Sequence, residues 1–89
     1  MPVDAETRVS VIGLGYIGLP TAALIARSGH KVLGIDISPE VVETINGGKV
    51  HIEEVDLEGL VQAVVARGSL RASTVPEEAD VFLIAVPTP

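Results

Sequence analysis

Three closely spaced glycines, Gly13, Gly15 and Gly18, separate a short apolar segment from a longer one rich in Ala and Leu. Residues 8–12 before them have the pattern of a β-strand, and residues 16–28 have the pattern of an α-helix. At such a junction the first glycine allows a sharp turn, the second lets backbone N–H groups approach a phosphate, and the third lets the helix pack close to the strand. The free N–H groups and positive dipole end of the helix then attract a pyrophosphate. The sequence therefore predicts a dinucleotide-binding unit.

An acidic residue follows at the distance that such a unit requires. Asp36 stands 18 residues after Gly18 and ends a strand predicted over residues 31–36. A carboxylate there accepts hydrogen bonds from both hydroxyls of the adenosine ribose and repels a 2′-phosphate. No Arg follows within residues 37–40, so NAD is favoured over NADP. The alternative, that Asp36 only begins a turn, is disfavoured by the spacing.

The remaining segments alternate between helix and strand patterns. Ser38 and Pro39 are typical of a helix start, and the glycines at 47 and 48 end that helix. A third helix is predicted over residues 57–67, with Asp56 as its cap. Further strands are predicted at 69–72 and 81–86, with one helical turn possible in 74–79. This alternation predicts an α/β fold: a Rossmann-type parallel sheet of about four strands, ordered 3-2-1-4, with helices on both faces.

Composition narrows the class of protein further. Hydrophobic residues make up 47% of the chain but aromatic residues only 2%, which suits aliphatic strands buried on both faces. A net charge of -6 argues against nucleic acid or a membrane surface as a partner. The absence of Cys excludes a disulfide framework and a Cys nucleophile within this sequence. No apolar run reaches the length of a signal or a membrane span, and we expect a cytoplasmic protein.

Length indicates an incomplete domain. The chain has 89 residues, about half of a complete dinucleotide-binding domain. We expect residues 1–89 to be the amino-terminal portion of such a domain, with the remaining strands, a central helix and a substrate domain absent.

From residue 9 to residue 89 the sequence resembles the amino-terminal NAD-binding part of the UDP-glucose/GDP-mannose dehydrogenase family. The matching pieces are GLGYIGLP (13–20), GID (34–36), INGG (45–48) and AVPTP (85–89). Within the family, residues 50–57, 70–73 and 83–89 look most like UDP-N-acetyl-D-mannosamine dehydrogenases. Val55 is a departure, because that subfamily commonly has Pro at this position.

The resemblance implies an NAD-dependent oxidation of a UDP-sugar primary alcohol to the carboxylate, in two hydride transfers. The family's second step uses a thiol nucleophile, which holds the aldehyde as a thiohemiacetal. The resemblance places that Cys and its assisting residues beyond residue 89, so we expect no catalytic residue here and no activity from this fragment alone. It also implies a homo-oligomeric, cytoplasmic parent enzyme that supplies sugar acids for surface polysaccharide.

The resemblance assigns cofactor contacts residue by residue. The pyrophosphate is expected near Gly13, Gly15, Tyr16, Ile17 and Gly18, and the adenosine ribose at Asp36. Thr88 is expected near the nicotinamide-side ribose or phosphate. The alternatives are that the Thr88 hydroxyl bonds the loop backbone and that Tyr16 packs on protein.

Other polar residues and other functions carry weaker predictions. His51 with Glu53, Glu54 and Asp56 suggests a metal cluster, but a capped helix start on a solvated acidic loop is the preferred interpretation, and no metal is expected. Two alternative functions stay open: another dinucleotide enzyme, such as a 3-hydroxyacid or 3-hydroxyacyl-CoA dehydrogenase, and a non-catalytic nucleotide-binding module. A Cys motif and a second nucleotide-binding domain after residue 89 would favour the sugar enzyme.

Overall fold

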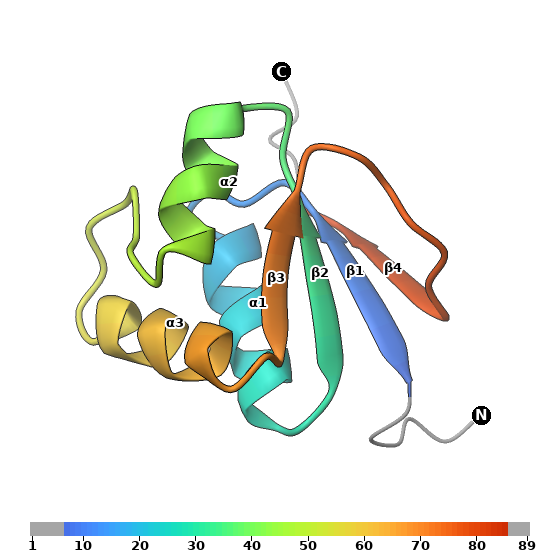
Figure 1. The fold of residues 1–89 in the computed structure, drawn as a ribbon, viewed down its shortest axis with the longest axis horizontal. Helices are drawn as coiled ribbons and strands as arrows, with labels where there is room; N and C mark the ends of the chain where they lie inside the picture. The colour runs from blue at the N-terminus through green and yellow to red at the C-terminus, as the bar shows by residue number, and fades with distance from the viewer. Residues whose placement is uncertain (1–6, 86–89) are drawn as a thin grey trace.

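Four parallel strands form the single sheet of the structure, a computed structural model that describes residues 7–85. They are β1 (Arg8–Ile12), β2 (Lys31–Ile35), β3 (Leu70–Ser73) and β4 (Val81–Ile84). Their order is β3-β2-β1-β4, with each neighbouring pair parallel (Figure 1). This confirms the predicted Rossmann-type order 3-2-1-4.

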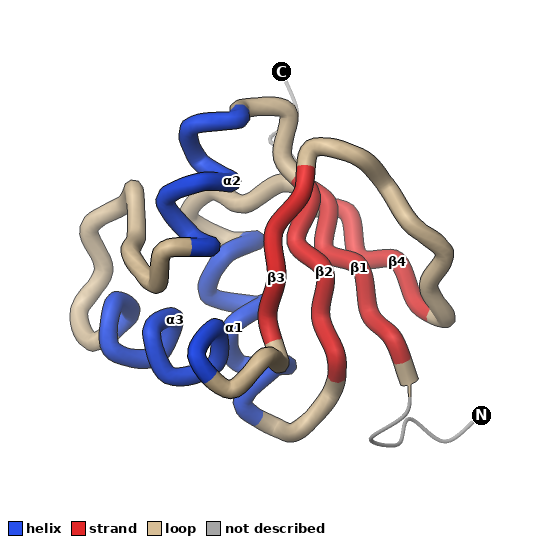
Figure 2. The backbone as a smooth tube through the Cα atoms, viewed as in Figure 1, coloured by secondary structure: helices blue, strands red, loops and turns tan. Residues whose placement is uncertain are grey.

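Three helices cover one face of this sheet. They are α1 (Gly18–Arg27), α2 (Pro39–Asn46) and α3 (Leu57–Ala66), and Figure 2 shows them together on the same side. Right-handed crossovers from β1 to β2 and from β2 to β3 progress in the same direction, so their helices must share a face. None of the described helices is long and apolar enough to cross a membrane.

The opposite face differs from the prediction of helices on both sides. Within residues 7–85 the connection from β3 to β4, residues 74–80, crosses that face without any helical turn. It must cover about 14 Å across the sheet and about 10 Å back along the strands. Seven extended residues reach about 23 Å, whereas seven helical residues reach only about 10 Å. The connection is therefore too short to be helical.

The core lies between the sheet and the three helices. Val9 of β1 is in register with Val32 of β2, which is in register with Leu70 of β3, and all three are buried. Buried Ala side chains at positions 22, 23 and 26 of α1 face them. Because Ala is small, α1 packs close to the strands, and its first turn is held at the carboxyl end of β1.

Element boundaries differ from the predictions by one or two residues. The first helix begins at Gly18 rather than at residue 16, and the third ends at Ala66. Strand β3 is shifted by one residue, to Leu70–Ser73. Strand β4 ends at Ile84, and position 86 of the predicted strand lies outside the described residues. None of these differences changes the predicted arrangement, in which the three glycines lie at the junction of β1 and α1 and Asp36 lies at the carboxyl end of β2.

Asn46, the last residue of α2, closes the outer edge of β3. Its Oδ1 accepts from the Ala72 N–H at 2.8 Å, and its Nδ2 donates to the Ala72 carbonyl at 2.9 Å. Ala72 is in register with Gly34 of β2, but its own backbone groups point away from β2. The Asn46 amide therefore takes the place of a neighbouring strand.

We predict that Asn46→Ala lowers the free energy of unfolding by about 1–3 kcal/mol, since two hydrogen bonds to buried backbone are lost. Urea unfolding followed by circular dichroism measures the change. Asn46→Asp is the matched variant, because it keeps an acceptor for the Ala72 N–H but sets a carboxylate oxygen against the Ala72 carbonyl in place of the donor. We expect Asn46→Asp to be destabilised at pH 7 as well, and a variant as stable as the original chain would contradict the role of the Nδ2–carbonyl bond.

Candidate functional site

The loop between β1 and α1, residues 13–17 and here called the glycine loop, begins with a tight turn. Gly13 has φ +95°, a left-handed conformation that favours glycine. Its N–H donates to the Ile35 carbonyl at 2.7 Å, so the turn stays attached to the end of β2. The predicted role of Gly13 as the turn residue is confirmed by this geometry.

Gly18 brings the first turn of α1 against that turn. A Cβ at Gly18 would lie 1.6 Å from the carbonyl oxygen of Gly13 and 3.3 Å from Cβ of Ala85. The first distance is physically impossible, so no side chain fits at position 18. The predicted close approach of helix and strand is therefore present, and Ala85, just after β4, lies at the same place.

Gly15 has a different environment. A Cβ built there would have no heavy atom within 4 Å, so the protein itself does not require glycine at this position. An open glycine beside a helix start fits a loop whose backbone is approached by a ligand. The neighbouring residues Tyr16 and Ile17 are 65% and 73% exposed, so the alternative in which Tyr16 packs on protein is not seen, and its cofactor contact stays a prediction.

The start of α1 has features of an anion-binding helix terminus. Its N-cap residue is Ile17, which makes no side-chain capping bond, and its first turn contains no acidic residue. By contrast, the start of α2 is capped by Ser38, whose Oγ accepts from the Val41 N–H at 3.3 Å. Helix N–H groups without a side-chain cap carry partial positive charge and attract phosphate oxygens.

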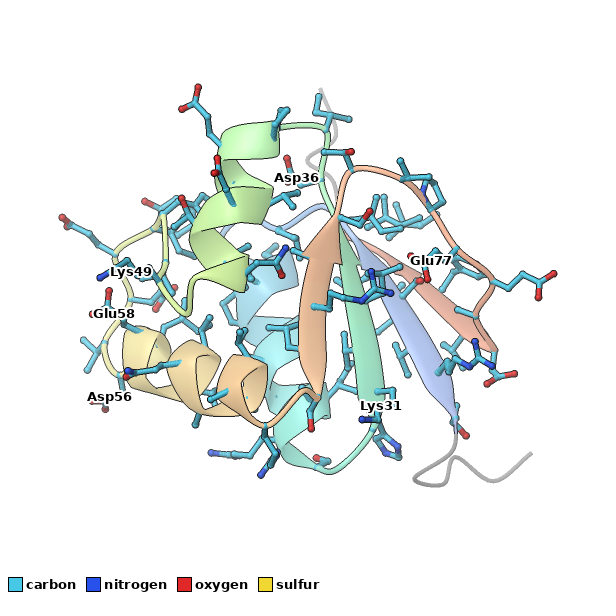
Figure 3. The ribbon with its side chains drawn as sticks, in the orientation of Figure 1. Lys31, Asp36, Lys49, Asp56, Glu58 and Glu77 are labelled. Carbon is cyan, nitrogen blue, oxygen red and sulfur yellow. The ribbon has the colours of Figure 1, made fainter. Side chains whose placement is uncertain are left out.

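Asp36 follows β2 and lies beside the glycine loop. Its Oδ2 accepts from the Leu14 N–H at 3.0 Å, and its Oδ1 accepts from the Ser38 N–H at 3.0 Å. Figure 3 shows Asp36 at the carboxyl end of β2, near the start of α2. Each carboxylate oxygen has a further lone pair, so Asp36 can accept from ligand hydroxyls while it keeps both backbone bonds.

The carboxyl ends of β1 and β4 lie side by side at the same edge. The Ala85 N–H donates to the Ile12 carbonyl at 2.7 Å. The strand order reverses between β1 and β4, and ligands of open α/β sheets bind at such a switch point. Thr88, the remaining predicted contact, lies outside the described residues.

Of the two predictions about the polar residues before α3, the side-chain cap at Asp56 needs correction, and the expected absence of a metal stays untested. Asp56 occupies the N-cap position of α3, but its backbone is left-handed (φ 65°) and its side chain makes no capping bond. The predicted side-chain cap is therefore wrong, because this backbone conformation replaces the extended one that capping needs. Among residues 7–85, no three His, Cys, Asp or Glu side chains are arranged to hold a metal.

A separate cavity lies at the amino ends of the strands. It has a volume of about 240 Å³ and is lined by Arg8, Ser10, Lys31, Arg71 and Glu77. Figure 3 shows Lys31 at the opposite end of the sheet from Asp36. The cavity is therefore distinct from the site formed by the glycine loop and Asp36.

Glu77 of the β3–β4 connection pairs with Arg71 at 3.0 Å. The hydrogen bond and the charge of Arg71 lower the pKa of Glu77 below its ordinary 4.5. A lowered pKa stabilises the fold above pH 4.5, and this contribution disappears as pH falls through the lowered pKa. We predict that Glu77→Gln slightly destabilises the chain at pH 7 and that the difference vanishes in acid, as measured by urea unfolding at both pH values. Since both side chains are about half exposed, added salt should also reduce the difference.

Residues 7–89 match the sequence model of the "UDP-glucose/GDP-mannose dehydrogenase family, NAD binding domain". The chain belongs to this family. The cofactor of its domain is NAD, as the glycines and Asp36 predicted.

Individual family members are similar to this chain in sequence. The chain is 60% identical over 82 residues to the UDP-N-acetyl-D-mannosamine dehydrogenase of Campylobacter jejuni, covering 92% of the chain and 20% of that protein. It is 57% identical over 88 residues to an NDP-N-acetyl-D-galactosaminuronic acid dehydrogenase of Ralstonia nicotianae, covering 98% of the chain and 21% of that protein. The chain therefore spans about a fifth of the length of these curated relatives.

A solved family structure has the same fold. The UDP-N-acetyl-mannosamine dehydrogenase of Staphylococcus aureus superimposes with a TM-score of 0.91 at 46% sequence identity, over 93% of this chain and 20% of that one. The fold of this chain is thus shared with a solved member of the family.

Leu14 and Gly34 lie in segments that resemble the family, but the sequence predicted no individual role for either. Leu14 of the glycine loop is buried, and the space for its side chain is provided by Gly34 in the middle of β2. The available signal was a glycine inside an apolar strand, which marks a close approach by another segment.

Proposed function

We propose that this chain is the amino-terminal NAD-binding portion of a sugar-nucleotide dehydrogenase that oxidises UDP-N-acetyl-D-mannosamine to the uronate with two NAD. The observation that carries the proposal is the combination of an open Gly15, an uncapped α1 and the Asp36 carboxylate around one loop. Identities of 57–60% to dehydrogenases named for N-acetylated sugar nucleotides support the substrate class.

The cofactor contacts are part of this proposal. Residues 13 and 15–18 surround the pyrophosphate: Gly13 supplies the turn, its own N–H being bonded to Ile35, and the backbone N–H groups of residues 15–18 face the phosphates. Asp36 binds the adenosine ribose. Thr88 contacts the nicotinamide side. When bound, NAD supplies the hydride acceptor, and this chain supplies its orientation. The Asp36 carboxylate also repels a 2′-phosphate and so selects NAD.

The catalytic residues belong to the rest of the protein in this proposal. This chain contains no Cys, so it cannot form the thiohemiacetal and thioester that a four-electron oxidation by the family's route requires. We therefore propose that the 89 residues alone are inactive and that the substrate domain follows residue 89. We also propose that the full-length protein is a cytoplasmic homo-oligomer.

Titration of the full-length protein with sugar nucleotide in the presence of NAD tests the function. With UDP-N-acetyl-D-mannosamine we expect two NADH per sugar oxidised. NADH formation is monitored by its absorbance. NADP should give much slower turnover. NADH formation from a 3-hydroxyacid but not from any UDP-sugar would overturn the proposal.

The name of one relative supports a second N-acetylated sugar as a candidate substrate. The relative from Ralstonia nicotianae, 57% identical over 98% of the chain, is named for N-acetyl-D-galactosaminuronic acid. UDP-N-acetyl-D-galactosamine should therefore be assayed beside UDP-N-acetyl-D-mannosamine, with UDP-glucose as a third substrate. The ratio of kcat/KM values assigns the sugar, and a preference for UDP-glucose would contradict the N-acetylated substrate class.

A further inference from the structure

Gly34, in the middle of β2, makes room for a side chain of the glycine loop. A Cβ at Gly34 would lie 2.7 Å and 2.9 Å from the two Cδ atoms of Leu14, and 3.3 Å from its Cγ. Real Cβ atoms are essentially never found within 3.0 Å of a heavy atom to which they are not covalently linked through the neighbouring chain. The Leu14 side chain therefore occupies the space where every other residue type would place its own Cβ.

Leu14 is the residue of the glycine loop that is fixed on both its backbone and its side chain. Its side chain is 1% exposed, and its N–H donates to Asp36 Oδ2 at 3.0 Å. Tyr16 and Ile17 of the same loop are mostly exposed. The position of the loop relative to β2 is therefore set largely at Leu14.

We propose that Gly34 is a positioning residue of the NAD site, which acts through Leu14 to hold the glycine loop and Asp36 at the separation that the cofactor needs. This inference rests on the proposed function and deepens it. Gly34 is outside the three-glycine motif and lies within the sheet, so its effect on the cofactor is indirect.

The packing around Leu14 explains why a side chain at position 34 would displace the loop. Leu14 belongs to the continuous hydrophobic core and has almost no exposed surface, so its Cδ atoms cannot swing into solvent. In a close-packed core an added methyl group is accommodated by shifting the neighbour. A shift of the Leu14 backbone lengthens its bond to Asp36 and moves the open backbone at Gly15.

The experiment measures NAD binding to the full-length protein by titration calorimetry. For Gly34→Ala we expect the Kd for NAD to rise roughly tenfold, because the displaced glycine loop no longer presents its backbone to the cofactor in the original position. The value of kcat at saturating NAD should change much less than KM for NAD. Faster amide exchange at the Leu14 N–H should accompany the weaker binding.

A double variant tests whether the effect passes through Leu14. Leu14→Val removes both Cδ atoms, and alone it should also weaken NAD binding because the loop loses its contact with β2. In Gly34→Ala/Leu14→Val the added methyl fills the vacated space, and we expect an affinity near that of the unmodified protein. Additive losses in the double variant would overturn the inference.

Gly59→Ala is the matched control. It adds the same methyl group at an exposed position of α3, where a Cβ would meet nothing within 4 Å, and NAD affinity should not change. Unchanged affinity in Gly34→Ala would overturn the positioning role, whereas absence of NAD binding to the unmodified protein would overturn the proposed function instead. If Gly34→Ala does not fold, the NAD affinity of Leu14→Val becomes the test. An affinity equal to that of the unmodified protein would then overturn the inference.

Discussion

Replacing Gly18 by alanine is expected to lower the free energy of unfolding by at least about 3 kcal/mol, the upper range of overpacking costs. The new Cβ would lie 1.6 Å from the Gly13 carbonyl oxygen, which is a backbone atom and cannot rotate away. Relief requires α1 to move off the end of β1, and the buried Ala residues of α1 lose contacts with the sheet. Thermal unfolding measures the loss, and NAD binding should become undetectable by calorimetry.

Gly15→Ala is the informative comparison, because it separates folding from ligand binding on the same loop. Its Cβ would contact no atom of the protein, so we expect stability to stay within about 0.5 kcal/mol of the original. NAD affinity should nevertheless fall, since the methyl group occupies space that the pyrophosphate needs. A strongly destabilised Gly15→Ala, or one with unchanged NAD affinity, would contradict the assignment of this glycine to the ligand.

Much of this site was predictable because each residue leaves a local signal in the sequence. A positive φ at Gly13 and the close approach at Gly18 require glycine whatever the rest of the protein does. Ser38 caps α2 by bonding a backbone N–H three residues later, which is a local interaction as well. The strand order followed from the alternation of helices and strands and the right-handedness of crossovers.

Long-range contacts were not predictable from one sequence. Arg67 donates from its guanidinium to the Ala26 carbonyl at 3.0 Å, at the end of α1, and Asn46 pairs with Ala72. Each joins residues at least 26 positions apart, and no spacing rule connects them. The single helical turn considered possible in residues 74–79 is absent, because seven residues must span three strand spacings and the length of a strand.

Asp36 combines a local signal with a long-range role. Its spacing from Gly18 predicted a ribose contact, but nothing in the sequence indicated that it also holds the Leu14 N–H. The carboxylate therefore links β2, α2 and the glycine loop. A substitution of Asp36 must therefore be measured at both the cofactor and the Leu14 N–H, so that the two roles can be separated.

We expect Asp36→Asn to raise the Kd for NAD about 100-fold, since a hydrogen bond to a charged group contributes about 1.5–3 kcal/mol and the Asn amide keeps only one of the two acceptor oxygens. Binding of NADP should not weaken and should improve relative to NAD, because the charge that repels a 2′-phosphate is removed. Calorimetric titration of the full-length protein with each dinucleotide gives both constants.

The matched control removes a carboxylate elsewhere on the same chain. Asp56→Asn makes the same chemical change at an exposed residue whose side chain forms no capping bond, and both Kd values should stay unchanged. If NAD and NADP lose affinity equally in Asp36→Asn, the carboxylate acts only by holding Leu14 and Ser38. If NAD alone loses affinity while the Leu14 amide keeps its exchange protection, the carboxylate acts on the ribose, which is the result that we predict.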